Sequence, residues 1–184
     1  MRPHFLPFAL SLFLFAGYCS QAQETADNWQ AILNARLPVF GHRNWIVIAD
    51  SAYPAQTRPG IETIVSSADH IEVLQEVLQA LEQSPHVRPT VYVDRELEFL
   101  DDKSVPGISA FRNQLSGILR ERPAEKILHE QIIAKLDGIS QTFRVLIIKT
   151  RMTMPYTSVF LQLDCAYWPP DAERRLRSAM ARSH

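Results

Sequence analysis

The segment Trp45 to Ala49 (WIVIA) constrains the fold more than any other part of the chain. A continuous apolar run rich in β-branched residues is typical of a strand that is buried on both faces. Such strands belong to α/β proteins, in which helices cover both sides of a sheet. The sequence therefore predicts an α/β fold with this strand in the interior of the sheet.

Further strand and helix patterns alternate along the chain. The expected strands are 90–93, 143–149 and 158–163, and the expected helices are 27–39, 67–81 and 106–119, with a loop over 50–60 and a basic, helix-prone tail from 171. Residues 126–136 fit either a short strand leading into a helix or one helix throughout. We expect a single layered α/β domain with a mixed, largely parallel sheet flanked by helices. Ligands of such sheets bind where strands end, at their carboxyl ends.

Composition excludes several function classes. The 184 residues, 46% of them hydrophobic, suit one domain with a real core. A formal net charge of −1 without a long basic run leaves no electrostatic footprint for nucleic acid. The sequence has no glycine-rich phosphate loop, no G-x-S-x-G elbow, and no H-E-x-x-H or Cys/His cluster for a transition metal.

The first residues have the pattern of an export signal. A positive charge precedes the apolar run 5–17, which is too short to span a bilayer. We expect residues 1–22 to be a signal peptide cleaved after Ala22, leaving an exported periplasmic or secreted protein without a membrane span. Lipoprotein processing at Cys19 and an uncleaved anchor are alternatives. In the mature chain Cys165 then stands alone, and we expect it to be a small core residue.

Two polar residues flank the central strand. Asp50 ends it, and a carboxylate there is costly to bury unless a partner or a ligand satisfies it. His42, in the pair Gly41-His42, precedes it. Alternatively, Asp50 only caps the following loop and His42 is an exposed loop residue.

Three further polar residues lie where other strands and helices begin. Tyr156 and Ser158 stand at the entrance of an apolar strand, where an ordinary turn is the alternative. His129 stands at a junction between elements, where a surface or capping role is the alternative. We expect His70 and His86 to lie at the surface.

Together these motifs resemble one known family. Gly41-His42, the eight-residue step to Asp50, Pro54, His129-Glu130-Gln131 and Pro155-Tyr156 before a strand resemble the D-ribose pyranase / L-fucose mutarotase family (RbsD/FucU). The family pattern is G-H, a buried I-V-I-A-D strand, a proline four residues after the aspartate, and Y-x-N before a final strand. The family domain would span 23–168, followed by an additional basic tail, 169–184.

The resemblance implies a cofactor-independent, metal-free isomerase of free ribose- or fucose-like monosaccharides. It implies that His42 donates a proton, that Asp50 binds the sugar and supports His42, and that His129 and Tyr156 also contact the sugar. Ser158 stands where the family has asparagine. Its side chain is shorter than that of asparagine and has one hydrogen-bond donor fewer. The resemblance also implies a homo-oligomer with sites between subunits. A non-catalytic, exported carbohydrate-binding or structural protein of the same fold is the alternative.

These residue types suit the implied chemistry. Exchanging sugar anomers, or pyranose and furanose forms, opens the ring: the ring oxygen gains a proton and the anomeric hydroxyl loses one. Histidine donates and accepts protons near neutral pH, and a carboxylate fixes its tautomer or holds the sugar hydroxyls. General acid–base assistance of this kind contributes roughly 10²–10⁴-fold.

Overall fold

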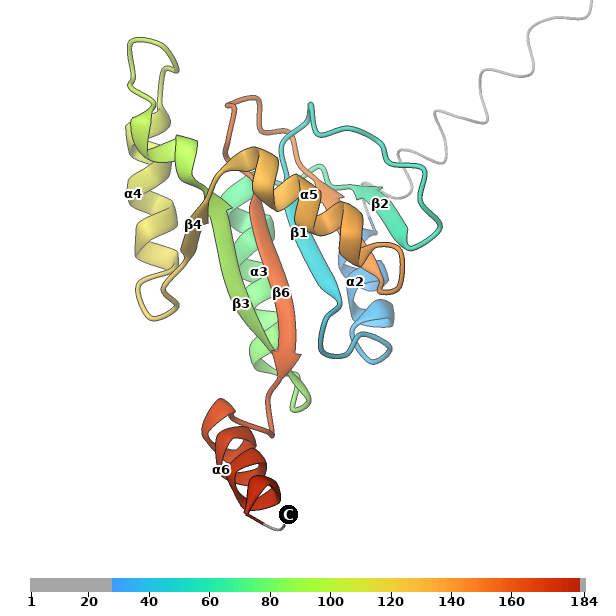
Figure 1. The fold of residues 1–184 in the computed structure, drawn as a ribbon. Coiled ribbons are helices and arrows are strands. Elements are labelled where there is room, and N and C mark those ends of the chain that lie inside the picture. Colours follow the sequence, from blue (N-terminus) through green and yellow to red (C-terminus); the bar gives the residue numbers. More distant parts are fainter. Residues whose placement is uncertain (1–27, 183–184) are drawn as a thin grey trace, which may run out of the picture.

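The structure, a computed structural model, describes residues 28–182. The expected signal peptide, residues 1–22, lies outside the described residues. Within them six strands form one sheet in the order β2-β5-β1-β6-β3-β4 (Figure 1). The strands are β1 Trp45–Ala49, β2 Ile61–Val65, β3 Val87–Asp94, β4 Glu125–Ile127, β5 Val145–Lys149 and β6 Val159–Cys165.

Among these six strands, β6 alone runs against the others. β5 pairs parallel with both β1 and β2, and β3 pairs parallel with β4. β6 lies between β1 and β3 and is antiparallel to both. The expectation of a mixed, largely parallel sheet is confirmed. One edge of the sheet therefore gathers the carboxyl ends of β1 and β3 and the beginning of β6.

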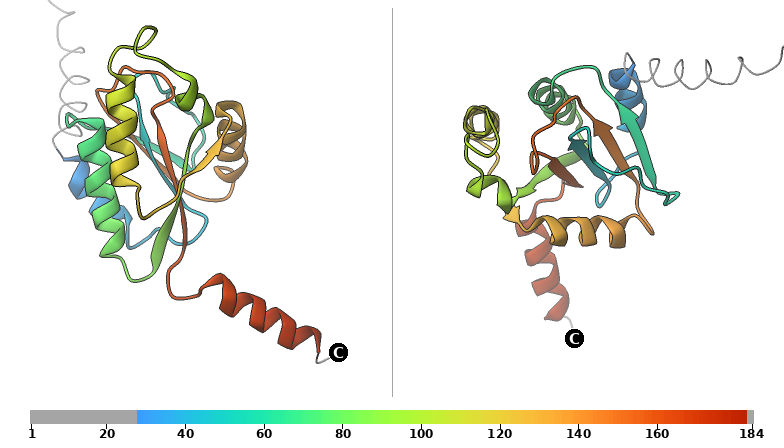
Figure 2. Two further views of the ribbon diagram at one scale, coloured as in Figure 1. Left: turned by 90° about the vertical axis from the view of Figure 1, so that its left-hand side faces the viewer. Right: turned by 90° about the horizontal axis from the view of Figure 1, so that it is seen from above.

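Helices cover both faces of the sheet (Figure 2). Helices α2, α3 and α4 pack on one face, and α5 packs on the other. Their bounds are α2 Trp29–Arg36, α3 His70–Glu82, α4 Ile108–Ile118 and α5 His129–Ile139, with a short 3₁₀ helix, η1, at Arg95–Phe99. The layered architecture explains why a continuous apolar run forms the central strand.

Strand β1 shows this layering directly, because all five of its residues are fully buried. Ile46 and Ile48 belong to the core with α2, α3 and α4. Trp45 and Val47 belong to the second core, with Ile132 of α5. Successive side chains of a strand point to opposite faces, so each face of the sheet needs an apolar residue at every second position.

Two parts of the sheet could not be assigned from the pattern alone. Residues 126–136 form a short strand, β4, that leads into α5, so the first of the two alternatives is confirmed. Strand β2 was not expected. It lies at the edge of the sheet, only Ile64 of its five residues is buried, and Glu62 points out to an ion pair with Arg36. An edge strand of this kind carries little apolar signal.

The C-terminal segment is separate from these layers. The expected tail forms helix α6, Pro170–Ala181, which has no buried residue and extends away from the sheet (Figure 1). Cys165, at the end of β6, is only half-buried, so the expectation of a core cysteine is wrong. None of the helices in the described part of the chain has the length and hydrophobicity that crossing a bilayer requires.

Candidate active site

Three polar residues lie together at the carboxyl edge of β1 and β3. Asp50 follows β1, Asp94 is the last residue of β3, and Ser158 immediately precedes β6. Val159 pairs with Ile48 on one side and with Val93 on the other. This register places Ser158 between the ends of the two parallel strands, with one aspartate on each side.

Asp50 is held by two hydrogen bonds. The Ser158 hydroxyl donates to Asp50 Oδ2 at 3.2 Å, and the Ala52 N–H donates to Oδ1 at 2.8 Å. Asp50 therefore caps the following turn and also joins the site at the edge of the sheet. The bond to Ala52 is the loop cap that the sequence left open as an alternative, and the second partner, Ser158, is another of the expected site residues.

His129 and Tyr156 lie against each other at the same edge. Their rings are 5.5 Å apart in an edge-to-face arrangement at 85°. The φ of Tyr156 is +57°, which a bulky residue adopts at a cost of about 1–3 kcal/mol, so the surrounding structure holds this ring in place. Four of the five expected site residues, Asp50, His129, Tyr156 and Ser158, thus lie at one edge of the sheet.

Asp94 also belongs to this site, although it is not among the residues expected from the sequence. Its side chain is fully buried, and its Oδ1 lies 3.2 Å from His129 Nδ1. Burial raises the pKa of Asp94 to about 6, while the neighbouring His129 acts in the opposite direction. The signal was present: an aspartate directly follows the apolar run Val91 to Val93, as Asp50 follows β1.

His70 is not at the surface, so that expectation is wrong. It is 2% exposed at the start of α3, and its Nδ1 lies 2.9 Å from Thr150 Oγ1. Its ring packs against Phe111 of α4. Burial lowers the pKa of His70 to about 4, so the ring is neutral at pH 7. His86 is half-buried, with Nε2 near the carbonyl oxygens of Leu37 and Phe40.

His42 lies at the opposite edge of the sheet, in the exposed turn before β1. The five residues of β1, at about 3.3 Å each, separate it from Asp50 by roughly 16 Å. Asp50 therefore does not contact His42 within a single chain, and support of His42 by Asp50 across two copies stays a prediction. The neighbouring Arg43 has a φ of +74°, so this turn is strained as well.

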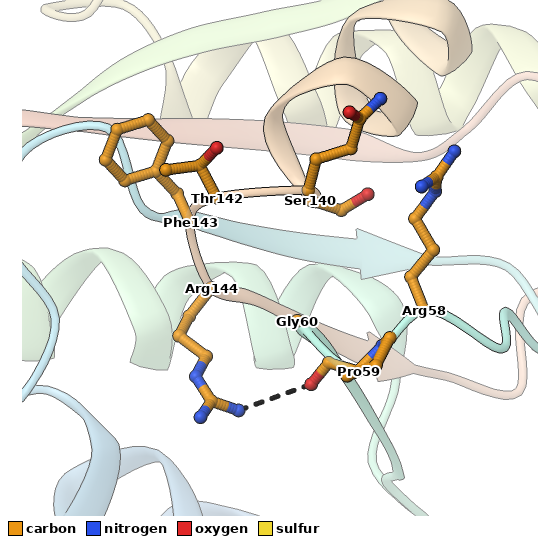
Figure 3. A pocket seen from close by; sticks show the side chains of 8 residues that line it. Arg58, Pro59, Gly60, Ser140, Thr142, Phe143 and Arg144 are labelled. Atoms are coloured by element: carbon orange, nitrogen blue, oxygen red, sulfur yellow. Dashed lines mark hydrogen bonds between the residues drawn. The ribbon is translucent and has the colours of Figure 1, made fainter.

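A hollow of about 470 Å³ opens at this amino edge, next to the beginning of β2 and β5 (Figure 3). Arg58 and Arg144 flank it, and Arg144 donates to the carbonyl oxygen of Pro59 at 3.4 Å. None of the expected sugar contacts lines it. Both arginines are exposed and the hollow is open to solvent. We place the candidate site at the other edge, because the buried Asp94, the half-buried Asp50 and His129 converge there.

The chemistry of that edge is acid–base and hydrogen bonding. Within residues 28–182, no three His, Cys, Asp or Glu side chains are grouped as metal ligands. The fold and the site together define a layered α/β domain with carboxylates, a histidine and a tyrosine at the carboxyl edge of its sheet.

Comparison with known proteins identifies the family. The model of the RbsD / FucU transport protein family matches residues 30–165, so the chain belongs to this family. Two solved structures share the fold. RbsD of Bacillus subtilis, complexed with D-ribose, is 18% identical with a TM-score of 0.51, over 72% of this chain and 90% of that chain. FucU of Bifidobacterium longum is 15% identical with a TM-score of 0.50, over 72% and 91%. No curated protein sequence matches significantly.

Proposed function

We propose that this protein is a sugar-ring isomerase, a mutarotase or pyranase, that acts on a free ribose- or fucose-like monosaccharide without a cofactor. One observation carries the proposal: Asp50, His129, Tyr156 and Ser158, which come from distant parts of the sequence, lie at one edge of the sheet. Membership of the RbsD / FucU family supports it. A D-ribose complex of a protein with this fold supports the class of ligand.

The groups at this edge suit the contacts that a sugar ring requires. The Asp50 carboxylate accepts from sugar hydroxyls, and the Ser158 hydroxyl, now bonded to Asp50, is a second polar group there. Tyr156, a residue that is 37% exposed, offers an apolar ring face and a phenolic hydroxyl. The His129 ring, whose side chain is 35% exposed, can exchange a proton with the sugar.

His42 enters the proposal through a second copy of the chain. It is the proposed acid, yet β1 separates it from Asp50 within one chain. We therefore propose a homo-oligomer in which His42 of one copy reaches the carboxyl edge of the next. There His42 would give a proton to the ring oxygen while a base takes one from the anomeric hydroxyl, which opens the ring.

We also propose that the protein is exported. The pattern of residues 1–22 is the basis for this part of the proposal. The mature chain should begin at Gln23 in the periplasm or the medium, which intact-mass measurement of the exported protein checks. A lipid-modified chain beginning at Cys19 would replace cleavage after Ala22, and a cytoplasmic chain that still carries residues 1–22 would contradict export.

A second candidate function is non-catalytic sugar binding. Ser158 is 2% exposed and its hydroxyl already donates to Asp50. The shorter side chain therefore reaches less far than an asparagine toward a sugar. Under this alternative the site binds a monosaccharide and leaves its exchange rate unchanged.

One experiment separates the two candidates. Saturation-transfer NMR on the mature chain should show accelerated exchange between anomers, or between pyranose and furanose forms, for one sugar of a panel that includes ribose, fucose and galactose. Calorimetry on the same panel measures binding. Binding without accelerated exchange favours the non-catalytic alternative. A folded protein that neither binds nor accelerates any sugar contradicts both candidates.

A further inference from the structure

Asp94 is a buried carboxyl group that the proposed sugar contacts do not explain. Its side chain is fully buried, and within residues 28–182 its Oδ2 has no hydrogen-bond partner. Its other oxygen, Oδ1, lies 3.2 Å from His129 Nδ1. A carboxyl group in such a place costs free energy of folding, because few partners replace its lost hydration. A specific role toward His129 accounts for its presence.

A second acidic residue of the same segment holds the backbone of His129. Both carboxylate oxygens of Glu96 lie 3.1 Å from the His129 N–H, which donates to them. The residue before α5, Leu128, makes no side-chain cap of its own. Asp94 and Glu96, two residues apart where β3 passes into η1, therefore hold the ring and the backbone of one histidine.

We propose that Asp94 is a positioning residue that keeps neutral His129 in the Nδ1–H tautomer, with Nε2 unprotonated toward the sugar site. An ionised carboxylate is only an acceptor, so Nδ1 must donate to it. The other ring nitrogen of a neutral imidazole is then an acceptor. In the described part of the chain no hydrogen bond engages His129 Nε2, and Tyr156 packs edge-to-face on the ring.

The role in ring opening rests on the proposed function. His129 Nε2 takes the proton of the anomeric hydroxyl, whose O–H electron pair forms the new C=O bond. The bond from the anomeric carbon to the ring oxygen breaks, and its electron pair stays on the ring oxygen, which takes a proton from the acid. Ring closure reverses each transfer. The ionised Asp94 stabilises the imidazolium that His129 becomes in between.

The surroundings of Asp94 set the pH range of this role. His129 faces it from α5, Glu96 from η1, and Asp50 and Tyr53 from the segment after β1. Burial, Glu96 and Asp50 raise the pKa of Asp94 to about 6, against the effect of His129. Above that pH the carboxylate accepts from Nδ1. Below it the protonated carboxyl no longer requires a donor at Nδ1, and the tautomer is released.

Nitrogen NMR of the histidine rings tests the tautomer without any sugar. In the mature chain at pH 7.5, ¹⁵N shifts should show Nδ1–H and an unprotonated Nε2 for His129. Asp94→Asn keeps an acceptor oxygen and should keep this tautomer, whereas Asp94→Leu, which removes every acceptor, should shift it toward Nε2–H. Glu96→Gln is the matched control, because it changes the backbone contact and leaves the ring partner. An Nε2–H tautomer in the wild type, or no change in Asp94→Leu, overturns the proposal.

Exchange kinetics test the consequence for turnover. For the sugar whose exchange the wild type accelerates, Asp94→Leu should lower kcat about ten-fold or more with KM nearly unchanged, and Asp94→Asn should fall between it and the wild type. Circular dichroism verifies that both variants fold. Unchanged kcat in folded Asp94→Leu overturns the positioning role and leaves the isomerase intact. The expected tautomers without any accelerated exchange would instead refute the isomerase and leave the Asp94–His129 contact standing.

Discussion

The polar residues at the two edges of the sheet differ in burial and in hydrogen bonding. At the carboxyl edge, Asp94 and Ser158 are buried, and Asp50 and His129 are bonded to them. At the amino edge, His42 stands in an exposed turn, and an open hollow flanked by arginines lies at the same edge. One edge is thus preorganised inside a single chain, and the other presents its histidine to the outside.

The difference between the two edges gives a reason why the motif from Gly41-His42 to Asp50 has one end at each of them. Gly41-His42 and Asp50 are eight residues apart, and a strand between them necessarily separates them by its own length. Under the proposed function, the preorganised edge binds the sugar and the exposed edge of a second copy supplies the acid. Backbone strain marks both ends, because Arg43 and Tyr156 are the non-glycine residues with positive φ in the described part of the chain.

The largest effect on the rate of sugar exchange should come from removing the histidine of the amino edge. His42→Ala should reduce accelerated sugar exchange by roughly 10²–10⁴-fold, because it removes the proposed acid, while the fold is unchanged. Saturation-transfer NMR measures the rate and circular dichroism the fold. An unchanged rate would remove His42 from the mechanism.

Mixing variants then tests the second copy. Chains with His42→Ala and chains with Asp50→Asn, unfolded and refolded together, should regain about a quarter of the wild-type rate, because roughly one interface in four then joins two intact edges. Each variant refolded alone is the control. No recovery in mixed oligomers would place both residues in the same copy.

The next largest effect concerns a histidine buried at the carboxyl edge. His70 has its pKa lowered to about 4 from an ordinary 6.5, so the unfolded chain binds its proton more readily than the folded one. The contribution of His70 to the free energy of unfolding should therefore be complete above pH 6.5 and fall by about 3 kcal/mol as the pH drops to 4. Asp94, whose pKa is raised, contributes in the opposite direction over the same range.

Urea titrations from pH 7.5 to 4 measure this loss. Over this range the wild type should lose about 3 kcal/mol more than His70→Asn, because the variant lacks the titrating ring. His42→Gln, at the exposed edge, is the matched control and should keep the wild-type pH profile. The same profile in all three proteins would show that His70 does not titrate as its burial requires.

A smaller effect should follow from removing one contact of the preorganised edge. Ser158→Ala loses the hydroxyl that donates to Asp50, and should lower the free energy of unfolding by about 1 kcal/mol and weaken sugar binding. Thr142→Ala, an exposed residue beside the amino-edge hollow, should change neither. Chemical denaturation and calorimetry give the two quantities, and equal effects of the two substitutions would contradict the difference between the edges.

The smallest effect concerns backbone strain. Arg43→Gly should raise the free energy of unfolding by up to about 1 kcal/mol relative to Arg43→Ala, since both lose the same side chain and only glycine relieves the positive φ. Tyr156→Gly should relieve similar strain but lose the ring packed on His129, so sugar binding should weaken. Thermal melts compare the variants, and Arg43→Ala at least as stable as Arg43→Gly would show that the turn is not strained.

The predictability of individual elements follows how much of their burial is local. WIVIA was recognised as a central strand because both of its faces are covered, and α3 because its buried residues recur at helical spacing. β2 was missed because an edge strand buries little, and β4 remained ambiguous because it has three residues. In each case, an element could be predicted when its own residues show which of its faces are buried.

The same distinction applies to the candidate site: its residues follow from local patterns, and its contacts do not. The motifs around Asp50, His129, Tyr156 and Ser158 were recognisable as residue patterns. Their contacts were not, because Ser158 and Asp50 meet across 108 positions of the chain. His70 was expected at the surface because nothing in its own segment shows that Thr150 and Phe111 pack around it.

Local residue order was thus sufficient for the α/β class, the central strand, most of the helices and the family resemblance. Strand order and register decided the rest. The insertion of β6 against β1 and β3 brings Ser158 between two aspartates, and the length of β1 keeps His42 away from them. The physical reason is that apolar periodicity reports which face of an element is buried, whereas contacts between polar groups depend on how distant elements align, which no single segment encodes.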